Sequence, residues 1–248
     1  MRNTTIRDVA RRAGVSISTV SRVLNNYSNV NDETRMIVEK AVKELDYSPN
    51  ALAKGLRSQK SQTLGLVVNN ILNPIYSILA QNIETTVRKY GFHLFLCNSG
   101  ANPQQEAEYL EALWHKKIDG LIISPTGANI ELLERYLQAK IPVVQIDRKV
   151  EGLNANVVLT DNVQGAQQLT AHLLERGYRK ISVIVGLQTV TTGVDRLKGY
   201  FDALLEKGIT PESSYIKIGD FSEETGYKLM KELLALPVPP DSVFVGNN

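Results

Sequence analysis

The sequence predicts a small all-α domain followed by a larger α/β domain with parallel sheets. In the first 47 residues the apolar residues recur at helical spacing, whereas from Thr63 onward short runs rich in valine, isoleucine and leucine alternate with amphipathic stretches. Residues 1–60 hold eleven lysines and arginines and six aspartates and glutamates, and the rest of the chain holds 17 basic and 20 acidic side chains. Only the first domain is therefore basic, as a surface that neutralises phosphates requires.

Two short helices joined by a tight turn are predicted between Thr5 and Asn25. Thr5 and Asp8 stand three residues apart, in the capping-box pattern that starts a helix, and Gly14 ends that helix. Ser16 can cap the second helix. The inward apolar positions of the two helices are Ile6, Val9, Ala10, Ala13, Val20, Val23 and Leu24. This spacing leaves the opposite side of the second helix exposed.

A third helix and a short apolar segment follow. The helix is predicted from Asn31 to Leu45. Its inward positions, which close a core shared with the first two helices, are Ile37, Val38, Ala41, Val42 and Leu45. The segment at residues 48–58 is too short to form a stable isolated helix, and Gly55 weakens it further. We expect it to become ordered only against a second surface; the alternative is a plain linker.

The exposed side of the second helix is a candidate DNA-reading surface. In a helix-turn-helix the second helix enters the major groove, and its first residues meet base edges. We expect Ile17 to pack on a thymine methyl group and Arg22 to form two hydrogen bonds with a guanine. The hydroxyl of Ser18 can donate a hydrogen bond to a base or accept one from it. The predicted phosphate contacts are Thr5, Ser16, Thr19, Ser21 and Asn25. The alternative is that the arginines of this region are ordinary solvated charges.

Repeated strand and helix order is predicted for the rest of the chain. The predicted strands are Leu64–Val68, His93–Cys97, Gly120–Ile123, Val143–Ile146, Val157–Leu159, Ile181–Val185, Tyr215–Ile218 and Val243–Val245. The predicted helices are Tyr76–Tyr90, Gln104–His115, Ile130–Ala139, Gln164–Arg176, Arg196–Lys207 and Glu223–Leu236. Apolar strands covered by helices favour doubly wound parallel sheets, which bind ligands beyond the carboxyl ends of their strands.

The loops after these strands suit a sugar or a related polyol. They carry hydroxyl, amide and carboxylate groups and two arginines, which can pair with sugar hydroxyls. Tyr76 and Phe221 offer flat apolar faces that can cover the C–H side of a sugar ring.

Several stretches of the chain carry a resemblance to a known family. Those of the first domain are Ala13-Gly14-Val15-Ser16, Thr19-Val20-Ser21-Arg22-Val23-Leu24-Asn25 and Leu45-Asp46-Tyr47-Ser48-Pro49-Asn50. Those of the larger domain include Asn73-Pro74, Asp119-Gly120, Ile141-Pro142-Val143-Val144, Asp147-Arg148, Arg176-Gly177-Tyr178, Arg196 and Gly219-Asp220-Phe221. With these motifs the chain resembles the lactose/galactose repressor family of bacterial transcription regulators.

The resemblance implies a repressor-type regulator that binds a palindromic operator in double-stranded DNA as a homodimer or tetramer, without a cofactor. It also implies two lobes like those of periplasmic binding proteins, with a small sugar or sugar-acid effector between them. Ile17 and Ser18 match the main specificity residues of the family. Ala53 and Leu56 match the hinge residues that enter the minor groove, although Gly55 stands where many relatives carry a longer polar residue.

The resemblance also implies an effector site. The matching residues are Asn73, Tyr76 and Asp147 on one lobe and Arg196, Phe221 and Asn247 on the other. Each of four of these residues also has an alternative role. Tyr76 can belong to a helix core, and Asp147 can form an ion pair with Arg148. Phe221 can pack within its loop, and Arg196 can cap a helix or pair with Asp195.

These patterns predict a DNA-binding head at residues 1–47, a hinge at 48–60, a first lobe at 61–160 and a second lobe at 161–248. Members of the family usually continue past the position of Asn248, where an aspartate is common. We therefore expect the second lobe to be truncated and the effector pocket to be incomplete.

Other classes of protein lack support in the sequence. There is no pair of glycines at i and i+2 and no phosphate-binding Gly-Lys-Ser or Gly-Lys-Thr loop, and the three histidines are far apart. Cys97 is expected to be a buried core residue. A sugar-active enzyme would need a carboxylate pair, for which Asp147 and Asp161 are the only candidates, and an exported sugar-binding protein would need a signal peptide and no basic head. We therefore expect a cytoplasmic, nucleoid-associated regulator that is neither an enzyme nor a membrane protein.

Overall fold

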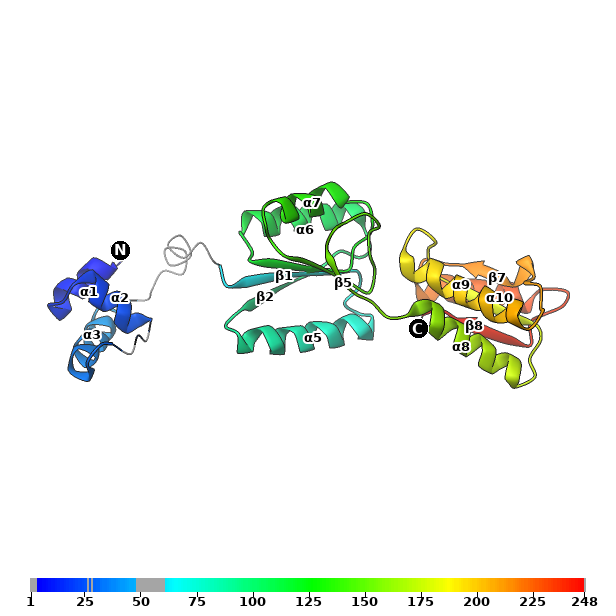
Figure 1. Cartoon of the computed structure of the whole chain (residues 1–248), viewed down its shortest axis with the longest axis horizontal. Coiled ribbons are helices and arrows are strands. Elements are labelled where there is room, and N and C mark those ends of the chain that lie inside the picture. The colour runs from blue at the N-terminus through cyan, green and yellow to red at the C-terminus, as the bar shows by residue number, and fades with distance from the viewer. Residues whose placement is uncertain (1–3, 26, 28, 48–60, 248) are drawn as a thin grey trace. The chain divides into compact units, whose positions relative to one another are not determined.

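The computed structural model describes residues 4–25, 27, 29–47 and 61–247. The chain divides into two compact units, Met1–Ser61 and Gln62–Asn248 (Figure 1). The predicted hinge with Ala53 and Leu56 lies outside the described residues, as does Asn248.

The first unit contains three helices, α1 (Ile6–Ala13), α2 (Ile17–Leu24) and α3 (Asp32–Glu44). Its core is small and shared by all three helices, because Val9, Val20 and Val38 are each fully buried in one cluster. Gly14 ends α1 with a φ of 66°. A left-handed backbone of this kind favours glycine, and it allows α2 to start only three residues later. The helical head predicted from the sequence is confirmed.

One predicted core position of the head is wrong. Ile37 was expected to face inward, but it is 45% exposed. Val38 and Ala41 occupy the inward line of α3 and are buried. Since each residue turns a helix by about 100°, the residue next to Val38 points away from the core.

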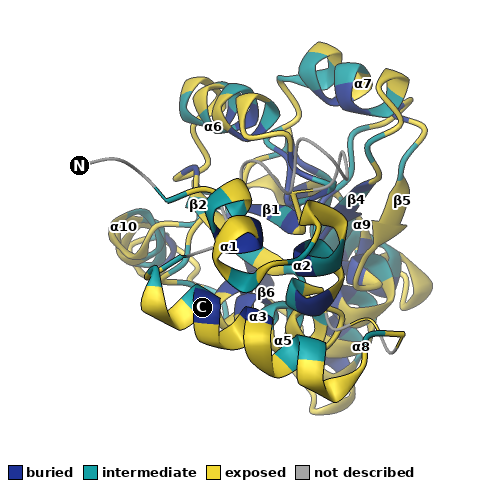
Figure 2. Cartoon of the chain, turned by 90° about the vertical axis from the view of Figure 1, so that its left-hand side faces the viewer, coloured by how far each residue is buried: buried dark blue, intermediate teal, exposed yellow. Residues whose placement is uncertain are grey.

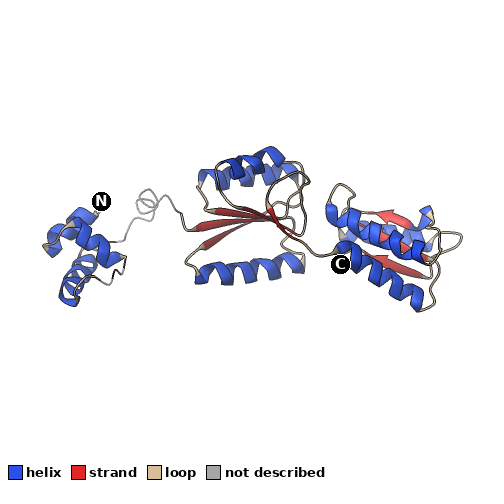
Figure 3. Cartoon of the chain, in the orientation of Figure 1, coloured by secondary structure: helices blue, strands red, loops and turns tan. Residues whose placement is uncertain are grey.

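The second unit begins with a five-stranded parallel sheet. Its strands are β1 (Thr63–Val68), β2 (His93–Asn98), β3 (Gly120–Ile123), β4 (Val143–Ile146) and β5 (Asn156–Val158), in the order β2-β1-β3-β4-β5. Helix α5 (Pro74–Lys89) covers one face, and α6 (Pro103–His115) and α7 (Ile130–Gln138) cover the other (Figures 1 and 3). Leu66 and Val68 accordingly pack with Tyr76 of α5, whereas Val67 packs with the helices of the opposite face.

A three-stranded parallel sheet follows, with strands β6 (Ile181–Val185), β7 (Ile216–Ile218) and β8 (Ser242–Val245) in the order β7-β6-β8. Its helices are α8 (Asn162–Glu175), α9 (Thr191–Glu206) and α10 (Glu223–Leu234), and a 3-10 turn, η1 (Ser213–Tyr215), precedes β7. Helices α8 and α9 pack together over the core that contains Val183 and Phe244. Figure 2 shows that buried residues concentrate on strands such as β1, β4 and β6, whereas the outer faces of α5 and α8 are exposed.

Helices α8 and α9 approach each other at backbone contact distance. A Cβ atom at Gly199 of α9 would lie 2.2 Å from the carbonyl oxygen of Val163 in α8. A second tight approach occurs at Gly193, where a Cβ atom would lie 2.0 Å from the carbonyl oxygen of Leu187. Real side chains do not tolerate such distances, so both positions require glycine in this packing.

The doubly wound parallel sheets predicted from the sequence are confirmed, with differences at some boundaries. Helix α9 begins at Thr191, five residues before the predicted start at Arg196, and Tyr215 lies in η1 rather than in β7. Cys97, predicted to be buried, is partly buried at the edge of the first lobe's core. Among the described residues no helix is long and apolar enough to cross a membrane, and no cluster of histidine, cysteine, aspartate and glutamate could hold a metal ion.

Candidate functional site

The outward face of α2 is exposed. Ile17, Ser18 and Arg22, the three predicted base-contacting residues, all lie on this face, while Val20 and Val23 on the other side are buried. The sequence therefore folds α2 so that one side holds the head together and the other is free to meet a partner.

Hydrogen bonds within the head order the small polar groups around α2. The Ser16 hydroxyl accepts from the Thr19 amide at 3.1 Å and is 2.7 Å from the Ser18 hydroxyl. At the other end, the Asn25 side chain donates to the Ser21 carbonyl at 2.7 Å. The Thr5 amide and hydroxyl both donate to Asp8, at 3.0 and 2.7 Å. All five predicted phosphate-contacting residues are thus held in place by short-range contacts.

The arginines of the head differ in their surroundings. Arg11 pairs with Asp8 and Arg12 pairs with Glu44. Arg7 and Arg22 form no ion pair with a residue that the structure describes. Both are exposed, so their charge remains directed to the solvent.

A cleft of about 1290 Å³ lies in the second unit. Its walls come from loops at the carboxyl ends of strands in both sheets, the position that doubly wound folds use for ligands. The six predicted effector residues all line it: Asn73, Tyr76, Asp147, Arg196, Phe221 and Asn247.

Tyr76 lies at the centre of a polar network in the first lobe. Its hydroxyl donates to Oδ2 of Asp147 at 2.7 Å and is 3.0 Å from the hydroxyl of the fully buried Ser124. Burial raises the pKa of the Tyr76 hydroxyl, and the Asp147 carboxylate raises it further. Tyr76 also belongs to the core beneath α5. Tyr76 therefore both packs in the core and lines the cleft, the two roles that the sequence leaves open.

Arg196 extends from the second turn of α9 and is half-buried. Its Nε donates to Oδ1 of Asn162 at 2.8 Å, and its Nη1 donates to the carbonyl of Gly246. Burial lowers the pKa of this guanidinium, and the nearby Asp147 carboxylate acts in the opposite direction. Arg196 therefore keeps its charge in the cleft while its hydrogen bonds go to neutral acceptors.

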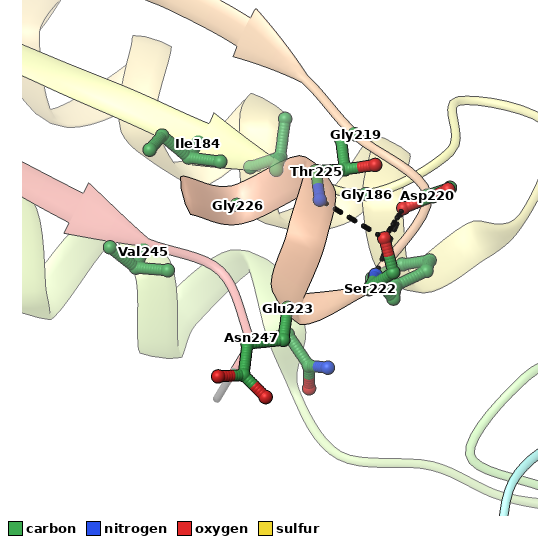
Figure 4. A pocket seen from close by; sticks show the side chains of 12 residues that line it. Ile184, Gly186, Gly219, Asp220, Ser222, Glu223, Thr225, Gly226, Val245 and Asn247 are labelled. Atoms are coloured by element: carbon green, nitrogen blue, oxygen red, sulfur yellow. Dashed lines mark hydrogen bonds between the residues drawn. The ribbon is translucent and has the colours of Figure 1, made fainter. Parts of the chain in front are cut away.

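Phe221 has a positive φ of 69° and places its ring directly over Gly186. A Cβ atom at Gly186 would lie 1.8 Å from the ring, so a larger residue there would displace the Phe221 ring. Phe221 also lines a smaller pocket of about 270 Å³, which Figure 4 shows with Asp220, Ser222 and Thr225. There the Ser222 hydroxyl donates to Asp220 and accepts from the amide of Thr225, which caps α10. Loop packing and lining of the cleft are thus both properties of Phe221.

Comparison with known proteins identifies the family of the chain. Residues 61–248 match the family described as periplasmic binding proteins and sugar binding domain of LacI family, and residues 5–50 match the bacterial regulatory proteins of the lacI family. The chain belongs to the LacI family. It is a transcriptional regulator with a helix-turn-helix DNA-binding domain and is not an enzyme.

Relatives of this LacI-family chain include two repressors. It is 37% identical to the HTH-type transcriptional repressor PurR of Edwardsiella ictaluri, over 98% of this chain and 72% of that protein. It is 34% identical to the ribose operon repressor of Escherichia coli K12, over 98% of this chain and 74% of that protein. Among solved structures, a transcriptional regulator CelR–cellobiose complex matches with a TM-score of 0.67 and 30% identity, over 98% of this chain and 74% of that one.

Arg148 and Thr192 are among the lining residues of the LacI-family cleft that the sequence does not predict as site residues. Arg148 belongs to one of the predicted ligand-binding loops but is assigned only an ion pair with Asp147, and its Nε lies 3.8 Å from the Asp147 carboxylate, beyond hydrogen-bond distance. Thr192 was placed in a loop, but it lies in the first turn of α9. Both residues are buried and line the cleft. No local pattern marks them, because their position depends on contacts between distant segments.

Replacing Tyr76 with phenylalanine should destabilise the second unit by about 1 to 2 kcal/mol. The substitution leaves the ring in the core but deprives the Asp147 carboxylate of its donor, and a buried group without its partner costs about this much. Urea unfolding followed by circular dichroism measures the change. Tyr90→Phe, at an exposed tyrosine that follows α5, is the control and should change the free energy of unfolding little. Equal effects of the two substitutions would show that the buried network contributes nothing.

Proposed function

We propose that this LacI-family protein binds a palindromic operator in double-stranded DNA as a homodimer, and that a small sugar-type effector in the cleft controls this binding. The observation that carries the proposal is the exposed face of α2 on the only basic domain of the chain. A helix placed in this way can enter a major groove while neighbouring cations neutralise phosphates.

In the proposed complex, Ile17, Ser18 and Arg22 contact base edges. An isoleucine suits a thymine methyl group, and an arginine that forms no ion pair with a described residue can fork onto a guanine. The residues proposed to contact phosphates are Thr5, Ser16, Thr19, Ser21 and Asn25. Their hydroxyl and amide groups are ordered by hydrogen bonds within the head, which favours a fixed register on the duplex. Ala53 and Leu56 are proposed to meet the minor groove.

An apolar surface of the first lobe supports the homodimer. Leu72 is 86% exposed, and Ile75 and Ile78 of the adjacent α5 are exposed too. The neighbouring edge strand β2 exposes Leu96 on the side of the sheet that α5 covers. Exposed apolar residues gathered on adjacent elements are typical of an interaction surface. Two copies of the head would then read the two halves of a palindrome; a tetramer would need a further interface.

The effector is proposed to contact Asn73, Tyr76, Asp147, Arg196, Phe221 and Asn247. Polar groups that can pair with hydroxyls and a ring that can cover a C–H face meet in this cleft. The relative named as a ribose operon repressor and the solved CelR–cellobiose complex support a sugar-type ligand. An effector that prefers one arrangement of the lobes shifts DNA affinity by its differential binding, commonly about 1 to 3 kcal/mol. The cytoplasm, where operator DNA is found, is the proposed location.

Selection of bound duplexes from a random pool tests the proposal. The full chain should enrich a palindrome with two related half-sites, and its affinity should fall steeply as the salt concentration rises. The control is Val20→Asp, which places a charge in the core of the head and should abolish enrichment. Enriched duplexes are then titrated in the presence of sugars, one of which should change the affinity. Recovery of sequences without two-fold symmetry would contradict the homodimer, and enrichment by Val20→Asp would contradict reading by α2.

A further inference from the structure

Two buried donors in the cleft have no hydrogen-bond acceptor in the described part of the chain. Arg148 is 8% exposed, and its Nε has no hydrogen-bond partner among the described residues. Thr192 is 2% exposed, and its hydroxyl also has no partner among them. The two residues belong to different lobes, and both line the cleft. Unpartnered polar groups inside a protein are costly, so their presence in a ligand cleft points to a ligand that supplies the acceptors.

The start of α9 adds positive potential at the same place. Val190, the residue before the helix, offers no side-chain cap, and the first turn contains Thr191 and Thr192. The amino terminus of a helix carries unsatisfied amide groups and a partial positive charge that favours anions. The backbone amide of Lys149 lies 3.3 Å from the Thr191 hydroxyl, so the segment just after Arg148 is in contact with this turn.

Arg148 is held in a defined orientation. Its guanidinium carbon lies 5.3 Å from the centre of the Phe221 ring. When the Asn69 amide is turned so that both of its polar atoms are satisfied, its oxygen accepts from Nη1 of Arg148 at 3.2 Å. A planar guanidinium fixed on an aromatic face is preorganised to bind a carboxylate or a phosphate with two parallel hydrogen bonds.

The charges of the inner cleft do not balance. Arg148 and Arg196 share one nearby carboxylate, that of Asp147, which already accepts from Tyr76. Two further acids line the cleft, but Asp220 and Glu223 are exposed, and the Asp220 carboxylate is bonded to Ser222 of its own loop. The inner part of the cleft therefore has an excess of positive charge.

We propose that Arg148 is a specificity-determining residue that selects effectors bearing an anionic group, a carboxylate or a phosphate ester, on a polyhydroxylated body. This inference rests on the proposed role of the cleft as the effector site. The anionic group accepts hydrogen bonds from Arg148 and Thr192 and lies at the amino terminus of α9. The hydroxyls of the ligand then meet the remaining polar groups of the cleft. A neutral sugar carries no negative charge to balance the excess positive charge of the inner cleft, so it binds more weakly.

Calorimetric titration of the full chain with matched ligands tests the inference. The probes are D-glucose, D-glucose 6-phosphate and D-gluconate, together with D-ribose and D-ribose 5-phosphate, and inorganic phosphate and acetate probe the anionic group alone. An anionic member should bind about tenfold or more tightly than its neutral counterpart, as expected for hydrogen bonds to a charged group. The phosphate and carboxylate members distinguish the two forms of the anionic group. Arg148→Gln should reduce the ratio of the affinity for the anionic ligand to that for its neutral counterpart to about one.

Controls separate the inference from the proposed function. Arg88→Gln removes the same charge from an exposed position on α5 and should behave like the unmodified chain, and circular dichroism verifies that each variant is folded. Neutral sugars that bind as tightly as anionic ones, or an anion preference that persists in Arg148→Gln, would overturn the inference and leave the effector cleft standing. Failure of every probe to bind would overturn both the inference about Arg148 and the proposed role of the cleft as an effector site.

Discussion

Replacing Gly199 with alanine should destabilise the second lobe by about 1 to 3 kcal/mol, the usual range for overpacking a closed core. The added Cβ atom would lie 2.2 Å from the carbonyl oxygen of Val163 and 2.8 Å from Cβ of Ala166. The nearest neighbour is a backbone atom, which cannot turn aside as a flexible side chain can. Helices α8 and α9 must therefore separate, and the core that contains Val183 and Phe244 opens with them. Urea unfolding by circular dichroism measures the loss, and hydrogen exchange of α8 and α9 assigns it to this lobe.

Gly226→Ala in α10 is the matched control for that substitution. Apart from its chain neighbours and the backbone of its own helix, no described atom lies within 4 Å of the position of its Cβ. Alanine is a better helix former than glycine by up to about 1 kcal/mol, so this variant should be as stable as the unmodified chain or more stable. If Gly199→Ala unfolds at the same urea concentration as Gly226→Ala, then α8 and α9 do not pack at the distance described here.

Replacing Arg22 with alanine should weaken binding to the selected palindrome by about 1 to 3 kcal/mol, a five- to 150-fold loss of affinity. Arg22 is exposed on α2 and forms no ion pair with a described residue, so its guanidinium is available to a guanine. Loss of a base contact affects the cognate site far more than a scrambled duplex. Fluorescence anisotropy on both duplexes, at one fixed salt concentration, measures the difference.

Arg11→Ala is the matched control because it removes the same charge from the exposed side of α1. Arg11 pairs with Asp8 rather than lying on the reading face. We expect a small loss that is similar on cognate and scrambled duplexes. A similar loss on both duplexes for Arg22→Ala as well would make Arg22 a phosphate contact and remove it from the proposed readers.

Much of the fold followed from local patterns. Capping residues and apolar spacing located the three helices of the head, because each is governed by interactions within a few residues. Parallel sheets followed from apolar strands alternating with helices. The strand orders β2-β1-β3-β4-β5 and β7-β6-β8 could not be predicted from these patterns, because residues close in sequence do not determine which strands become neighbours.

The early start of α9 shows why some boundaries were beyond local reasoning. Residues 190–193 are Val-Thr-Thr-Gly, and β-branched residues followed by glycine predict a loop. In the structure Gly193 is helical and packs so closely against the carbonyl of Leu187 that a larger residue would collide with it. Tertiary packing thus overrides local propensity, and it brings Thr192 into the cleft.

The candidate effector site was anticipated in part. The six residues suggested by resemblance do line one cleft. Arg148 was read as half of a sequence-adjacent ion pair with Asp147, which is ordinarily a surface feature. In the structure it is buried and contacts the ring of Phe221, which is far away in the chain. Only a three-dimensional arrangement reveals that this arginine retains an unused donor.

In both sheets every strand runs parallel to its neighbours, so the strands form the core and their carboxyl ends lie together at the cleft. All carboxyl ends of a sheet emerge on one side, so the cleft is lined mainly by loops and by the first turns of helices that follow the strands. Such connections can be exchanged or mutated while the hydrophobic clusters that hold the lobes together stay intact. The same architecture can thus be retuned toward new signalling molecules, which makes the chain a practical starting point for biosensor engineering.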